Sequence, residues 1–98
     1  MKSRFDSSFL TNSTETLRSI AHPIRLAIID LLYHKNELSV TQIYETLHIE
    51  QAIASHHLRI LKDKRVVSVK REGKHSFYTL TSKEFYQVIL ALENSTIK

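Results

Sequence analysis

The stretch QAIASHHLRILKDKR, residues 51–65, has the pattern of a helix with two unlike faces. Ala54, Leu58 and Leu61 recur at helical spacing, which predicts a face that packs against a hydrophobic core. The opposite face carries hydrogen-bonding or cationic side chains that suit base edges and phosphates: Gln51, Ser55, His56, Arg59 and Lys62. We interpret the stretch as the recognition helix of a DNA-binding domain.

The five polar positions divide by their place along this helix. Gln51, Ser55 and His56 lie near its start, which is the part that enters a major groove, so we expect them to read bases. Arg59 and Lys62 lie further along and are expected to hold the DNA backbone. The alternative for Gln51 and Ser55 is that they only cap and solvate the helix.

Positive charge is concentrated in and just after this stretch. Residues 56–75 contain seven Lys or Arg residues against two acidic residues, hence a net charge of +5, whereas the whole chain carries +4. A basic segment of this kind predicts a polyanionic partner, here double-stranded DNA. The alternative is a solvated basic face that has no partner.

The elements around this stretch are marked by capping and turn residues. Pro23 can open a helix as its first residue, and Ser39 with Gln42 forms a capping-box pattern. Gly73 lies between two β-rich runs and predicts a hairpin turn. The expected elements are helices at about 12–21, 23–34, 39–47, 51–65 and 82–95, with a hairpin at about 66–80. Capping boxes at residues 12–15 and 81–84 are expected to open the first and last of these helices.

Together these elements predict a single domain over residues 1–98, mostly α with a small β-hairpin. The two helices of residues 39–65 form a helix-turn-helix, and the hairpin of residues 66–80 is the wing of a winged helix. The tip of the wing is basic and is expected to reach phosphates or the adjacent minor groove through Lys70, Arg71, Lys74 and His75.

The last helix is apolar over most of its circumference, so its apolar surface exceeds what the core of a single small domain can cover. We therefore expect a homodimer in which helices from both chain ends, about 12–21 and 82–95, pack against a second copy. The residues expected at this interface are Phe5, Phe9, Leu10, Leu17, Phe85, Val88, Ile89 and Leu92.

Composition excludes several other classes of site. The chain has no cysteine, which rules out disulfides and thiolate metal sites and is consistent with a cytoplasmic protein. No stretch is apolar enough to be a membrane span or a signal peptide. No Gly-framed nucleophile, acidic pair or phosphate loop indicates an enzyme, so we expect no catalytic residues, no metal site and no cofactor.

Three segments, in this order and spacing, resemble the ArsR/SmtB family of bacterial winged-helix repressors: LRSIAHPIRLAII at 17–29, ASHHLRIL at 54–61 and KREGKHSFY at 70–78. The resemblance implies a homodimer that binds operator DNA and releases it on a chemical signal. The sensing residues depart from the family pattern. Ser39 and Thr41 stand where metal-sensing members have cysteines, and the last helix carries Glu84, Gln87 and Glu93 where others have Asp and His ligands. The effector is therefore unknown.

Histidine is the one remaining candidate metal ligand. The chain has six histidines, and imidazole suits zinc, nickel or copper, but no two of them have the i, i+4 spacing of a helical chelate. The alternative function is thus a histidine-based metal-sensing repressor whose non-standard site is shared between subunits. His57 falls on the core side of its helix and is expected to be half-buried and hydrogen-bonded.

Overall fold

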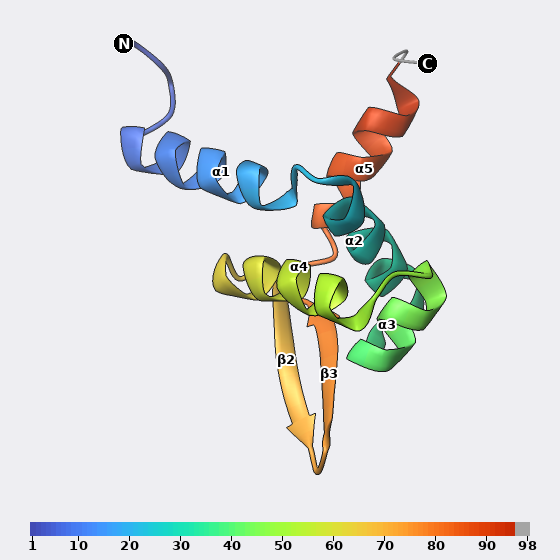
Figure 1. Ribbon diagram of the computed structural model, residues 1–98. Helices are drawn as coiled ribbons and strands as arrows, with labels where there is room; N and C mark the ends of the chain where they lie inside the picture. The colour runs from blue at the N-terminus through green and yellow to red at the C-terminus, as the bar shows by residue number, and fades with distance from the viewer. Residues whose placement is uncertain (96–98) are drawn as a thin grey trace.

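The computed structural model describes residues 1–95, which form five helices and a small antiparallel sheet. In Figure 1, α2 and α4 lie at the middle of the molecule, the β2–β3 hairpin extends to one side, and α1 and α5 project away from it. This is the mostly helical winged architecture that the sequence predicts. The elements are α1 (Ser7–Ile20), α2 (Pro23–Lys35), β1 (Glu37–Ser39), α3 (Val40–Leu47), α4 (Gln51–Asp63), β2 (Val67–Glu72), β3 (His75–Leu80) and α5 (Phe85–Asn94).

The core forms where the apolar faces of α2 and α4 meet. Ile28, Ile29 and Leu32 of α2 are at most 1% exposed, as are Leu58 and Leu61 of α4. Partly buried side chains of α5 and the sheet pack against this cluster. The core face predicted for residues 51–65 is therefore confirmed, and it fixes which face of α4 remains free.

The predicted helix starts at Pro23 and Ser39 are confirmed. Pro23 is the first residue of α2, where its missing N–H costs no hydrogen bond. Ser39 Oγ accepts from Gln42 N at 3.1 Å, and Gln42 Oε1 accepts from Ser39 N at 2.9 Å. This reciprocal capping box satisfies two backbone donors at the start of α3.

The wing forms as expected, with one additional strand. β2 and β3 pair antiparallel around Gly73, whose φ of +61° is the left-handed value that favours glycine. No strand was predicted between the helices at 23–34 and 39–47, but Glu37–Ser39 forms β1, which pairs with β3 and gives the sheet order β1-β3-β2. This strand links the start of α3 directly to the wing.

The first helix begins five residues earlier than predicted. The capping box expected at residues 12–15 is absent, since α1 starts at Ser7 and runs through that segment. The hydroxyl of Thr14 instead donates to the carbonyl of Leu10 at 2.8 Å, inside the helix. The rings of Phe5 and Phe9 stack at 4.8 Å and support this extra turn.

The last helix begins later than predicted, at Phe85 rather than near residue 82. Thr81 does not cap it, because its Oγ1 donates to the carbonyl of Arg65 at 2.6 Å and ties the end of β3 to the α4–β2 connection. A turn follows, in which Ser82 Oγ accepts from Glu84 N at 3.2 Å. No helix within residues 1–95 is both long and apolar enough to cross a bilayer.

Candidate nucleic-acid interface

The turn between α3 and α4 sets the direction of the candidate recognition helix. His48 ends α3 in the left-handed conformation, with φ +54°, and its N–H donates to the carbonyl of Glu45. Ile49 N donates to Tyr44 O at 3.1 Å, so the chain reverses tightly before Glu50. Glu50 is the N-cap of α4 and makes no side-chain capping hydrogen bond. The two helices are thus joined as a helix-turn-helix requires.

The outer face of α4 is free over its whole length. Its buried residues are Ala54, His57, Leu58 and Leu61, all on the opposite side. Helical spacing places the remaining polar residues together, so the structure brings the predicted set onto one surface. The exposed members of this outer face are Gln51, Ser55, His56, Arg59 and Lys62.

The basic wing tip, formed by Lys70, Arg71, Lys74 and His75, is also exposed. Arg71 Nη1 donates to Ser76 Oγ at 3.2 Å, which directs the guanidinium across to the paired strand β3. No carboxylate oxygen lies within 4 Å of Lys74 Nζ in residues 1–95. Figure 1 shows the hairpin projecting away from the helices on the side of α4 opposite to α1 and α5, so the wing tip extends the cationic surface outward.

Lys70 differs from its neighbours on the wing because it already has two acidic partners. Its Nζ lies 3.0 Å from Glu72 Oε1 and 3.4 Å from Glu37 Oε2. These carboxylates, Glu72 first, raise the pKa of Lys70 above its ordinary value. Glu37 reaches Lys70 from β1, the strand that the sequence did not predict. The ammonium of Lys70 is thus paired with two carboxylates of its own chain before any partner binds.

Three of the six histidines gather between the start of α2 and the middle of α4. The rings of His22 and His57 lie 4.2 Å apart, and those of His56 and His57 lie 5.0 Å apart. His57 is only 7% exposed, and its Nδ1 has no hydrogen-bond partner within residues 1–95. The expectation of a half-buried, hydrogen-bonded His57 is therefore wrong on both counts, because the ring lies against His22 and no acceptor or donor reaches Nδ1.

The histidine cluster does not have the geometry of a metal site within one subunit. The rings of His22 and His57 are tilted by 33° relative to each other, and Nδ1 of His22 is already used to accept from Ile24 N. No group of three or more His, Cys, Asp or Glu side chains in the described part of the chain could hold a metal ion. A histidine site shared between two subunits stays a prediction.

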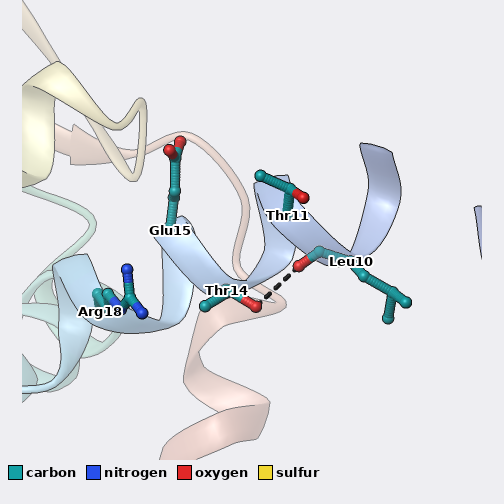
Figure 2. A pocket seen from close by; sticks show the side chains of 5 residues that line it. All are labelled: Leu10, Thr11, Thr14, Glu15 and Arg18. Carbon is teal, nitrogen blue, oxygen red and sulfur yellow. Dashed lines mark hydrogen bonds between the residues drawn. The ribbon is translucent and has the colours of Figure 1, made fainter. Parts of the chain in front are cut away.

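The residues expected at a dimer interface fall into three groups. Phe5, Phe9, Leu17 and Leu92 are 39–54% exposed, an unusual state for large apolar side chains. Leu10 is half-buried and, as Figure 2 shows, points away from Glu15 along a shallow groove on α1 that Thr11, Thr14 and Arg18 complete. The remaining three residues, all on α5, pack partly against the chain's own core: Phe85, Val88 and Ile89.

Comparison with known proteins agrees with this arrangement. The family model described as "Bacterial regulatory protein, arsR family" matches residues 22–69. The HTH-type transcriptional repressor SmtB of Mycobacterium tuberculosis is 34% identical over 76 residues, which are 78% of this chain and 56% of that protein. The chain thus spans little more than half of that relative. Transcriptional repressor PagR of Bacillus anthracis is 34% identical over 83 residues, 85% of this chain and 83% of PagR.

Solved structures show the same fold. The crystal structure of PagR has a TM-score of 0.79 at 32% identity and covers 89% of this chain and 99% of PagR. HlyU from Vibrio cholerae has a TM-score of 0.80 at 29% identity, covering 95% of this chain and all of HlyU. A homodimeric winged helix-turn-helix DNA-binding domain from Mycobacterium bovis has a TM-score of 0.82 at 22% identity. The match covers 100% of this chain and 93% of that domain. This chain therefore belongs to the ArsR family of bacterial regulatory proteins, whose winged helix-turn-helix fold it shares.

Proposed function

We propose that this chain is a transcriptional repressor that binds a two-fold symmetric DNA operator as a homodimer, in the cytoplasm. The observation that carries the proposal is that the polar and cationic residues of the outer face of α4 and of the basic wing tip are all exposed. Such a surface offers hydrogen-bond donors to a major groove and positive charge to the phosphates on either side. SmtB and PagR, which this chain resembles, are named as repressors.

Within this surface we assign different tasks to different residues. Gln51 and Ser55 lie one turn apart near the start of α4, with His56 beside them, and would contact base edges. A Gln side chain can pair with adenine through two hydrogen bonds, and a Ser hydroxyl can serve either base type. Arg59 and Lys62 lie further along α4 and would hold phosphates, together with the wing tip.

The proposed homodimer accounts for the apolar side chains that the single chain leaves in water. Phe9, Leu17 and Leu92 are at least half exposed, on the two helices that project from the domain in Figure 1. A second copy that covered them would remove their apolar surface from water, and each Å² so buried would stabilise the dimer by roughly 25 cal/mol. The M. bovis domain with the same fold is homodimeric. A two-fold dimer presents two α4 helices to successive grooves of one duplex.

Selection of bound duplexes from a random pool tests this function. The expected product is a palindrome whose half-sites lie about one helical turn apart, roughly 34–36 Å. Arg59→Ala should abolish binding to the selected duplex while the dimer persists, and Ser55→Ala should relax the sequence preference. Lys2→Ala, which removes a cation before α1, serves as the charge control and should bind normally. Equal affinity for every duplex, or a monomer at working concentrations, would contradict the proposal.

A further inference from the structure

His22 holds the start of α2 through the nitrogen that a proton would occupy. It is the N-cap residue, and its Nδ1 accepts from Ile24 N at 3.1 Å. An imidazole nitrogen accepts a hydrogen bond only while it carries no proton, and the doubly protonated imidazolium has no acceptor. Protonation of His22 therefore removes the side-chain cap from α2.

His57, whose ring on the recognition helix lies 4.2 Å from that of His22, is likewise suited to the neutral form. The ring is 93% buried, and no hydrogen-bond partner within residues 1–95 would stabilise a proton on Nδ1. Burial lowers the pKa of His57 below its ordinary value of 6.5, and the nearby charges of His22, Arg25 and His56 lower it further. The closed arrangement of α2 against α4 thus disfavours a charge on His57.

The surroundings of the pair reinforce this preference. Arg25, one turn into α2, has a buried Nε without a hydrogen-bond partner in the described residues. The groups that act on the charge of His57 are His22 and Arg25 from the start of α2 and His56 from α4 itself, and none of them is acidic. The other elements packed against α4, namely α1, α3 and β2, contribute no group to this set. A proton on His57 would thus find no acidic side chain among these groups.

We propose that the adjacent imidazoles of His22 and His57 form a proton-sensitive latch that holds the recognition helix against α2 when neutral and releases it when protonated. This inference rests on the proposed function, since it concerns regulation of the same DNA-binding surface. Ser55 and Arg59 flank His57 on α4, so a displacement of α4 at His57 also displaces the outer face that would read DNA. Acidification would then weaken DNA binding.

The direction in which DNA affinity changes with pH distinguishes the latch from a histidine that contacts DNA directly. A positive charge gained by a histidine that faces phosphates would strengthen binding as the pH falls. The latch acts in the opposite direction. Because the folded pKa of His57 lies below its unfolded value, the unfolded or opened state binds the proton more readily. The closed state is thus fully favoured above about pH 6.5 and is lost as the pH falls below it.

The test compares the affinity for a selected duplex at about pH 7.5 and about pH 5.5, at constant ionic strength. In the opened state, an imidazole with the ordinary pKa near 6.5 is about nine-tenths protonated at the lower pH. Its protonation favours opening by up to about tenfold, so the wild type should lose affinity, by up to about tenfold. The double variant His22→Asn/His57→Gln cannot take up these protons and should keep or gain affinity. Asn retains an N-cap acceptor for α2. His34→Gln removes an exposed histidine elsewhere and should respond as the wild type does.

Amide hydrogen exchange without DNA provides a readout that does not depend on the proposed function. In the wild type, protection of α4 amides relative to β2 and β3 should fall at the lower pH, after correction for intrinsic rates, and in the double variant it should not. Should the double variant fail to fold, His22→Asn alone should still reduce the response. A wild type that binds no duplex at either pH refutes the proposed function, while unchanged α4 protection refutes the latch. An equal loss of affinity in wild type and variant also refutes the latch.

Discussion

Glu72→Gln should strengthen DNA binding and make it more sensitive to salt. In the structure Glu72 is the closer of the two carboxylates that hold Lys70, at 3.0 Å, so its neutralisation leaves the ammonium with only Glu37 at 3.4 Å. Lys70 is exposed, and once freed it can turn toward a phosphate. The ammonium of Lys70 would then pair with a DNA phosphate instead of with Glu72.

The magnitude follows from counterion release. Each phosphate that a protein cation neutralises contributes about 0.9 to the slope of log affinity against log salt, so a homodimer gains up to about 1.8. Between about 50 mM and 200 mM salt this steepens the fall in affinity by about tenfold relative to wild type. Fluorescence anisotropy of a labelled, selected duplex across this range measures both slopes.

Two further variants test whether Lys70 causes the steeper dependence of affinity on salt. In a Lys70→Ala background, Glu72→Gln should steepen the slope by less than half as much, because the cation it would release is gone. Glu93→Gln removes an equal charge from α5, which projects away from the wing in Figure 1, and should leave the slope unchanged. The reasoning is refuted if Glu72→Gln steepens the slope equally with and without Lys70, or not at all.

Three other substitutions test the core, a helix cap and the proposed dimer. Leu58→Ala, at a site 1% exposed, should lower the free energy of unfolding by about 2–5 kcal/mol in urea titrations, and a loss under about 1 kcal/mol would contradict its place in the core. Ser39→Ala should cost about 1 kcal/mol in the same assay, whereas Thr41→Ala, outside the capping box, should cost less. Leu17→Glu should give a folded monomer in sedimentation velocity, and a persistent dimer would exclude Leu17 from the interface.

The parts of the fold that could be predicted from the sequence are those that local chemistry sets. Pro23 and the Ser39–Gln42 box fixed the starts of α2 and α3 because their capping partners lie within three residues. Gly73 fixed the hairpin turn through its backbone freedom. The outer face of α4 followed from helical periodicity, and the family resemblance drawn from three short segments was confirmed by the comparisons.

The helix starts that were predicted wrongly involve side chains that hydrogen bond elsewhere. Thr14 was expected to lie in a capping segment, yet its hydroxyl donates to Leu10 O within α1. Thr81 was expected to cap α5, yet it donates to Arg65 O, sixteen residues away in sequence. A Ser or Thr hydroxyl can satisfy a cap, a preceding turn or a distant carbonyl, and sequence spacing does not distinguish these partners.

The sequence by itself determined the helix-turn-helix, the wing, the polar outer face of α4 and the family, because each depends on periodicity and capping within a few residues. Only the tertiary structure decided which charged and titratable groups meet. The pairing of β1 with β3 brings Glu37 to Lys70, and the packing of α2 on α4 brings the ring of His22 beside that of His57. These contacts join residues more than thirty positions apart, where the energy of a pair depends on register and burial that no local pattern encodes.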